Sequence, residues 1–171
     1  VYIDVGNKEA VVPMPLYYRL DEHETEFQIS QRFMDAVRLL DPNLQSAAVE
    51  GWNALWQAGT YTGMALANFG GQVTDAPTLL ADPSVWERQL KLLAEAQPEF
   101  GEVVAWLFHP SFKNKPELRL RRTAAFLQKI AIFTLEPHMR AMFGAGLPEI
   151  NWQEIVATGK TVLFDLRHVY D

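Results

Sequence analysis

The chain has 171 residues, of which 49% are hydrophobic and 12% aromatic, and this is enough to build one domain with a hydrophobic core. Disordered and fibrous classes are excluded by that composition, and no apolar run approaches the roughly 18 residues of a membrane-spanning helix. Cysteine is absent, which excludes disulfides and thiolate metal sites and suits a cytoplasmic protein. The net charge of -6 argues against a protein that binds nucleic acid through its whole surface.

The chain opens with two extended segments. Val1–Val5 is an apolar strand, and Val11–Leu16 contains two prolines, which disfavour a helix. The acidic stretch Asp21–Glu26 then suits the amino end of a helix, because negative side chains are favourable there. We predict a first helix over Glu24–Leu40, and its apolar face consists of Phe27, Phe33, Met34, Ala36, Val37 and Leu40.

A second helix is predicted over Asn43–Asn68, after Asp41-Pro42 ends the first. Gly59 and Gly63 lie one turn apart on its apolar stripe, where the missing side chains would let another helix approach closely. The alternative is a break near Thr60 that divides this segment into two shorter helices. The other members of the stripe are Ala48, Trp52, Leu55, Trp56 and Leu66.

Glycine and proline residues mark where helices end and begin in the rest of the helical region. Phe69–Gly71 ends the second helix, and Asp82-Pro83 begins a helix that runs to about Ala96. The remaining predicted elements are a turn over Thr78–Ala81, a helix from Gln97 that breaks at His109–Ser111, a loop over Phe112–Pro116, a long helix over Glu117–Leu135 built on Leu120, Ala124, Leu127 and Ala131, and a short helix over Glu136–Met142.

Positive charge is concentrated in the segment 113–122. Its five cationic residues and the single acid Glu117 give a local balance of +4, so the rest of the chain carries -10. Two interpretations stay open, a solvated helix start and a contact surface for phosphate or an acidic partner. The candidate contact residues are Lys113, Lys115, Arg119, Arg121 and Arg122.

The segment Asn151–Leu166 predicts a short helix, a glycine turn and a buried strand. A strand this apolar needs neighbours for its backbone groups and side chains, and the same holds for Val1–Val5. We therefore expect the chain to be a segment of a larger protein. An all-α region at residues 21–147 would lie between terminal segments at 1–20 and 148–171.

Two nucleotide-binding motifs are imitated near the end of the chain. Thr158–Thr161 contains the GKT that ends a P-loop, but Glu154 stands where the first glycine is required, and the helix precedes the strand. Val162–Asp165 imitates the magnesium-binding strand of ATPases, but Leu166 follows in place of an acidic residue. We therefore predict no nucleotide site in this chain, and for Asp165 either a structural role or one of supporting a neighbouring ligand residue.

Other reactive side chains form no recognisable constellation. Trp52 and Trp56 lie one turn apart and could stack on a base, but packing in the core is the favoured interpretation. No serine or threonine lies in a nucleophile elbow, and the histidines are too scattered for a metal site. We predict exposed or capping roles for the four histidines, which are His23, His109, His138 and His168.

Together these segments resemble the helicase-like pumping ATPases of the HerA/FtsK group, which includes TraG/TraD-type conjugation coupling proteins and type IV secretion ATPases. Tyr2–Lys8 looks like the strand and polar turn that precede the family's helical insertion. Val12–Leu16 resembles its extended "NPL" stretch, with Met14 where Asn is usual, and Thr78–Leu80 resembles a turn inside the insertion. The similarity is strongest in the last third, at Arg119–Phe126, Leu135–Gly144, Ile150–Trp152 and Val162–Leu166.

The resemblance implies a mainly α fold, a multi-helix bundle flanked by short terminal β-strands that belong to the sheet of a parent ATPase. ATP and magnesium would bind elsewhere in that parent, because both defining ATPase signatures are missing here. No catalytic, cofactor-binding or metal-binding residue therefore carries over to this chain. The parent would be a cytoplasmic homo-hexamer, and its partners would include DNA or a secretion or conjugation adaptor protein.

We therefore expect a non-catalytic lobe that engages substrate or partner protein during DNA translocation, conjugation or type IV secretion. The alternative is a free-standing helical binding module for a small molecule or peptide, with a cleft lined by Trp52, Trp56 and Trp86. That module would need a deep, mostly apolar pocket between helices, whereas the lobe requires the same tryptophans to be packed inside. An enzymatic role has the least support.

Overall fold

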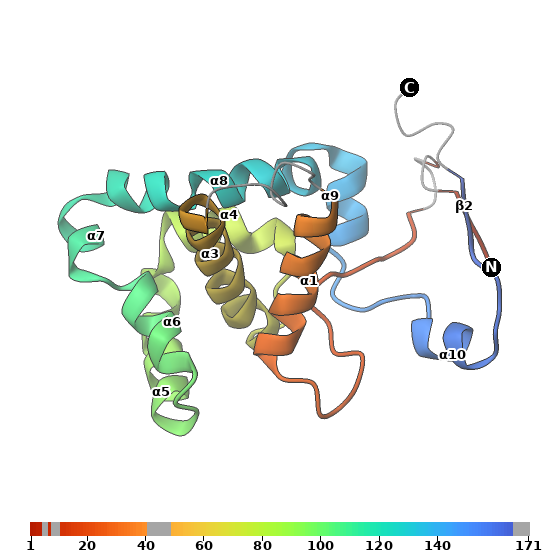
Figure 1. The fold of residues 1–171 in the computed structure, drawn as a ribbon, viewed down its shortest axis with the longest axis horizontal. Coiled ribbons are helices and arrows are strands. Elements are labelled where there is room, and N and C mark those ends of the chain that lie inside the picture. Colours follow the sequence, from red (N-terminus) through yellow and green to blue (C-terminus); the bar gives the residue numbers. More distant parts are fainter. Residues whose placement is uncertain (5–6, 8–10, 41–48, 166–171) are drawn as a thin grey trace.

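The protein is mainly helical, with one short parallel sheet, in the computed structural model shown in Figure 1. The structure describes residues 1–4, 7, 11–40 and 49–165. Its elements are β1 (Tyr2–Asp4), α1 (Glu26–Leu40), α3 (Val49–Asn68), η1 (Val73–Asp75), α4 (Ala76–Ala81), η2 (Pro83–Trp86), α5 (Glu87–Ala96), α6 (Phe100–Leu107), α7 (Pro110–Asn114), α8 (Pro116–Leu135), α9 (Pro137–Phe143), α10 (Trp152–Ala157) and β2 (Leu163–Asp165).

Helices α1 and α3 pack closely because α3 presents two glycines to its neighbours. A Cβ added to Gly59 would lie 2.1 Å from the Met34 sulfur, and one added to Gly63 would lie 2.8 Å from Ser30 Oγ. Helix α3 continues through Thr60, so the predicted close approach is confirmed and the alternative break is wrong. The predicted start of this helix and its stripe member Ala48 lie outside the described residues.

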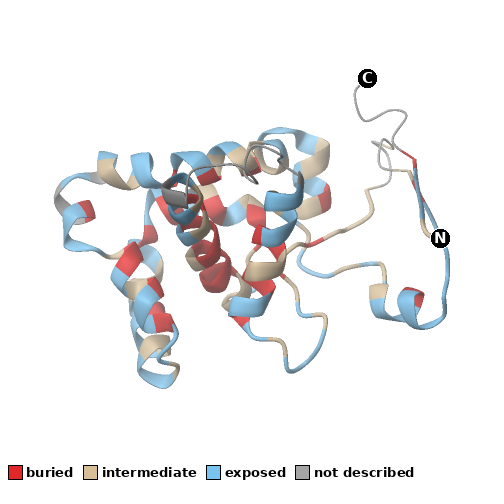
Figure 2. Ribbon diagram, in the orientation of Figure 1, coloured by how far each residue is buried: buried red, intermediate tan, exposed pale blue. Residues whose placement is uncertain are grey.

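The main core surrounds α3, and Figure 2 shows buried residues gathered on that helix and on the helix faces around it. Helix α8 enters this core with Phe126 and Ile130, both fully buried, whereas Leu120 is exposed. The predicted buried face of α8, which began at Leu120, is therefore wrong. The observed buried face is displaced from it by about one residue along the helix, or about 100° around the helix axis. Thr123 can lie on the buried face because its hydroxyl donates to the Arg119 carbonyl oxygen at 3.0 Å.

The segment predicted as a loop at Phe112–Pro116 is instead divided between two helices. Pro110 occupies the first turn of α7, and His109 Nδ1 accepts a hydrogen bond from the Ser111 amide at 3.3 Å. Proline is well tolerated at the start of a helix, because the amide that it lacks would have no partner there. The pair His109-Pro110 therefore both separates α7 from α6 and begins α7. The predicted turn at Thr78–Ala81 is also longer, since α4 begins at Ala76.

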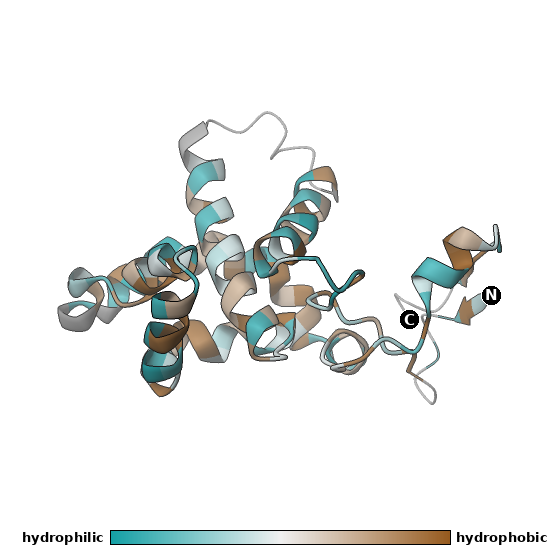
Figure 3. Ribbon diagram, turned by 90° about the horizontal axis from the view of Figure 1, so that it is seen from below, coloured by the Kyte–Doolittle hydropathy of each residue, from teal (hydrophilic) through white to brown (hydrophobic). Residues whose placement is uncertain are grey.

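The two terminal strands pair in parallel, with Tyr2 opposite Leu163 and Asp4 opposite Asp165. A second, smaller core joins them to the helices, and Ile3 and Met142 are its fully buried members. The Met14 amide also donates to the Met142 carbonyl oxygen at 2.9 Å. Figure 1 shows β2 and α10 set apart from the helical body, and Figure 3 shows the hydrophobic strand β1 in the same outlying part.

Among the helices of the described residues, none combines the length and the apolar character that crossing a bilayer requires.

Candidate anion-binding surface on helices α7 and α8

Phe112 is the centre of the candidate site, and it is placed there by the short helix α7. Its ring is 2% exposed and packs edge-on against Trp106, with the ring centroids 6.4 Å apart. The guanidinium carbons of Arg119 and Arg122 each lie 5.6 Å from the centre of the Phe112 ring. A cation above an aromatic face is held by the quadrupole of the ring, so Phe112 fixes both arginines at one place.

The structure brings two of the five predicted contact residues together and separates the others. Arg119 and Arg122 are three residues apart on α8, so they share the helix face that meets α7. Arg121 is exposed and points about 100° away from Arg122 around the helix axis. Lys115 is the exposed N-cap of α8, and the side chain of Lys113 lies outside the described part of the structure. We call Lys115, Arg119, Arg121 and Arg122 the α8 basic surface.

The α8 basic surface lies at the end of the helix where positive charge is least favourable. The amino end of a 20-residue helix carries a positive partial charge, and a cationic side chain close to the first turn, as in Lys115 and Arg119, is slightly destabilising there. Within the described part of the chain, none of the four residues forms a salt bridge. The cations and the helix end therefore combine into one concentrated positive region on a chain of net charge -6.

Arg119 is the most constrained member of the α8 basic surface. Partial burial lowers the pKa of its guanidinium, and the negative charge of Asp82 opposes that shift. Its Nε is shielded from solvent and has no hydrogen-bond partner among the described residues. A cavity of about 230 Å³ lies against Arg119 and is also lined by Asp82, Ser84, Glu87 and His109. The two carboxylates disfavour an anion inside this cavity, so an anionic partner would have to bind Arg119 and Arg122 from outside it.

The turn that contains GKT does not fit a phosphate-binding loop. Thr158–Thr161 follows α10 and precedes β2, and Gly159 has a φ of 64° where the helix ends. The Lys160 ammonium is engaged with the Glu154 carboxylate at 2.7 Å. The lysine therefore caps and pairs with its own helix, and the residues present do not suit a nucleotide.

Asp165 at the end of β2 has a structural contact, as expected for a strand-end aspartate. It is buried, and it accepts a hydrogen bond from the Tyr2 hydroxyl across the parallel pair. The residue that follows it, Leu166, lies outside the described residues. In the described ranges, no group of three or more histidine, aspartate or glutamate side chains is placed to hold a metal ion.

Two of the described histidines, His109 and His23, have the predicted capping and exposed roles. His109 caps α7, and His23 is highly exposed beside Glu22, 3.6 Å from its carboxylate. His138 is partly buried in α9, and His168 lies outside the described residues.

The three tryptophans of the alternative module lie in separate surroundings, each partly buried against the main core. Trp86 contacts Phe69 beyond the carboxyl end of α3, with ring centroids 4.7 Å apart. Trp52 lies near the amino end of α3, under the guanidinium of Arg38 at 5.1 Å. At about 1.5 Å per residue, 17 residues of helix separate these surroundings by about 25 Å. A single small-molecule cleft lined by Trp52, Trp56 and Trp86 is therefore not supported.

The sequence predicted the cations of the site but not the ring beneath them. Phe112 was assigned to a loop, so its role could not be seen. The signal that could have revealed it is the proline at position 110, which suits the first turn of a helix and would place Phe112 in a helix rather than in a loop.

Comparison of the chain with protein-family models, with curated proteins and with solved structures gives no match.

Proposed function

We propose that this chain is a non-catalytic all-α lobe of a P-loop motor ATPase of the HerA/FtsK type, and that it engages DNA or an adaptor protein through the α8 basic surface. The observation that carries the proposal is the pair of arginines held over Phe112 without salt-bridge partners in the described residues. Unpaired cations at the amino end of a helix weaken the fold, and a binding role gives a physical reason to keep them.

The terminal sheet supports the attachment of this lobe to a larger sheet. Parallel strands are rarely stable as an uncovered pair, because both faces and both edges need neighbours. Here the side chains of Tyr2 and Leu163 are 61% and 60% exposed, and Phe164 is also exposed. In our proposal the rest of the parent ATPase, a cytoplasmic homo-hexamer, supplies the missing strands and binds ATP and magnesium.

The helical region would then act as a binding lobe carried by the motor. Phe143 joins the two cores, since it packs against the main core and also against the small core of Ile3 and Met142. A movement of the sheet would reach the helices through this junction. The DNA or adaptor contact would lie at α7 and α8, at the opposite end of the long axis from α10 in Figure 1.

The test is a charge reversal with a control of equal charge. Binding of the 171-residue chain to fluorescent duplex DNA is measured by anisotropy at several salt concentrations, for wild type, Arg122→Glu and Arg88→Glu. Arg88 is exposed on α5, outside the α8 basic surface, so both variants change the net charge equally.

We expect Arg122→Glu to weaken DNA binding about tenfold at low salt. The magnitude of the slope of log affinity against log salt should fall by about one, which corresponds to the loss of one phosphate contact. Arg88→Glu should weaken binding less than twofold. Equal losses would show that only net charge matters and would contradict a local site. If wild type itself does not bind DNA, the same variants are compared for association of the parent with its adaptor protein, and no difference there would refute the proposal.

A further inference from the structure

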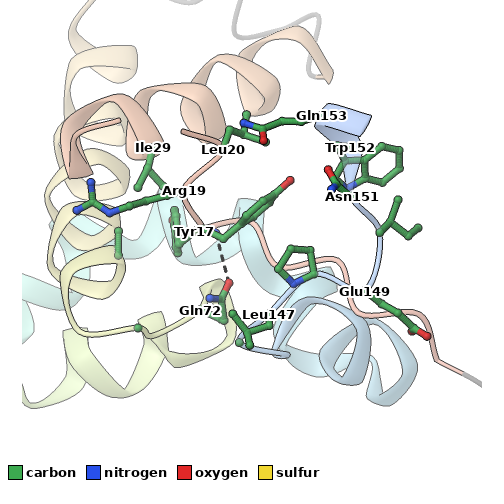
Figure 4. Close-up of a pocket in the computed structure, with 16 residues that line it drawn as sticks. Tyr17, Arg19, Leu20, Ile29, Gln72, Leu147, Glu149, Asn151, Trp152 and Gln153 are labelled. Atoms are coloured by element: carbon green, nitrogen blue, oxygen red, sulfur yellow. Dashed lines mark hydrogen bonds between the residues drawn. The ribbon is translucent and has the colours of Figure 1, made fainter. Parts of the chain in front are cut away.

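A cavity lies at the junction between the helical body and the segment that leads to α10. It has a volume of about 600 Å³, within the usual range for small-molecule sites. One wall is formed by the residues before α1 and after α3, and the other by residues 146–153. Figure 4 shows these two walls facing each other across the cavity, with Tyr17 and Gln72 on one side and Asn151 and Trp152 on the other.

This cavity lies between the two hydrophobic cores, so anything that fills it would contact both. Tyr17 belongs to the main core, whereas Ile150 and Trp152 pack against the small core of Ile3 and Met142. Trp152 is held in place on its other side by Phe164 of β2, whose ring stacks on it at 6.2 Å. Ligand sites occur preferentially at such junctions between packed units.

Tyr17 provides the strongest sign that the cavity awaits a ligand. Its side chain is 3% exposed, and its hydroxyl has no hydrogen-bond partner among the described residues. The ring is fixed edge-on against Phe33, with centroids 5.2 Å apart, and it also lies against Gly63 of α3. Burial raises the pKa of this hydroxyl, so it remains a neutral donor. A buried donor without an acceptor destabilises a protein by about 1–3 kcal/mol.

Two amide side chains of the lining also offer donors without net charge. The Gln72 side-chain oxygen accepts from the Tyr17 amide at 3.3 Å, and the Asn151 side-chain oxygen accepts from the Glu154 amide at 3.0 Å. Each of these side chains therefore keeps its NH2 group as a donor. Among the described lining residues, the cation Arg19 is already engaged by the carboxylate of Glu26, and the exposed carboxylate of Glu149 disfavours an anionic ligand.

We infer that the junction cavity binds an uncharged molecule that carries a carbonyl group and a short apolar group, about the size of one or two amino-acid residues. The carbonyl oxygen accepts from the Tyr17 hydroxyl and from the free amide donors. The apolar group packs against Leu147 and Trp152, which also line the cavity. The site is separate from the α8 basic surface, so it stands or fails independently of the proposed function.

The experiment is a titration of the ¹⁵N-labelled 171-residue chain with N-acetyl-L-leucinamide, followed by NMR. We expect saturable shifts of the side-chain amides of Gln72, Asn151 and Gln153. Tyr17→Phe should weaken this binding about five- to tenfold, while the free protein unfolds at the same temperature or higher, because the variant removes a donor that has no partner. The control Tyr61→Phe removes a hydroxyl that bonds to Glu102, outside the cavity, and should leave the affinity unchanged.

Three results would overturn the inference. The first is the absence of saturable shifts at the cavity residues in wild type. The second is equal affinity of wild type and Tyr17→Phe for the probe. The third is equal or tighter binding of the carboxylate analogue N-acetyl-L-leucine, which would contradict the selection for a neutral ligand.

Discussion

Replacing Gly63 with alanine tests the close packing on which the helical body depends. The added Cβ would lie 2.8 Å from Ser30 Oγ, 3.0 Å from Tyr17 Cε1 and 3.1 Å from Ser30 Cβ. Neither neighbour can move easily, because the Ser30 hydroxyl donates to the Glu26 carbonyl oxygen at 2.8 Å and the Tyr17 ring is held by Phe33. The substitution must therefore strain the contact between α1 and α3.

The expected magnitude follows from two opposing effects. Overpacking a core position destabilises by about 1–3 kcal/mol, and exchanging glycine for alanine inside a helix stabilises by up to about 1 kcal/mol. We therefore expect Gly63→Ala to lower the free energy of unfolding by about 1–2 kcal/mol. For a chain of this length, that corresponds to a fall in Tm of roughly 2–8 °C.

Gly51→Ala is the matched control, because Gly51 lies on the same helix and an added Cβ would have no neighbour within 4 Å. It should raise the free energy of unfolding by up to about 1 kcal/mol. Both variants are compared with wild type by circular dichroism during thermal and urea unfolding. If Gly63→Ala proves as stable as Gly51→Ala, the packing of α1 on α3 is not as close as described, and the reasoning fails.

Two further predictions concern hydrogen bonds outside the candidate sites. Burial, together with the hydrogen bond that its hydroxyl donates to Glu102, raises the pKa of Tyr61 from 10.0 to about 12. The unfolded chain then loses the hydroxyl proton of Tyr61 at a lower pH than the folded chain does. The stability that Tyr61 contributes is therefore full below pH 10 and is lost as the pH rises toward 12. Glu102→Gln should lower the titration midpoint of Tyr61 in NMR, and an unchanged midpoint would show that Glu102 does not raise this pKa. Asp165→Ala removes the acceptor of the Tyr2 hydroxyl, and hydrogen exchange of the Leu163 amide, which donates to the Val1 carbonyl oxygen at 2.8 Å, should become about tenfold faster. Exchange at the wild-type rate would show that this bond does not hold the two strands together.

Local signals were sufficient to predict most helix ends. Asp82 accepts from the Ser84 amide at 3.0 Å just before Pro83, and Glu136 accepts from the Met139 amide just before Pro137. Gly70 has a φ of 69° two residues after the end of α3. Capping oxygens, prolines and glycines act on the backbone within a few residues, so their effect is visible in the sequence without any knowledge of the fold.

The candidate site was only partly visible in this way. The cations of the segment 113–122 could be counted, but their mutual positions depend on how α7 packs beside α8. Phe112 brings Arg119 and Arg122 together because α7 is a helix and turns its ring inward onto Trp106. Arg121 lies apart because adjacent residues of a helix point in different directions.

The sequence by itself determined that this is a mainly helical chain with strands near both ends, and where most of its helices begin and end, because these features depend on local signals. Only the tertiary structure decided which face of α8 is buried, because Phe126 and Ile130 fill the core better than the smaller stripe of Leu120 and Ala124. It also decided that Tyr17 and Asn151, far apart in the chain, line one cavity. Such choices depend on the shapes of distant segments, which no local pattern contains.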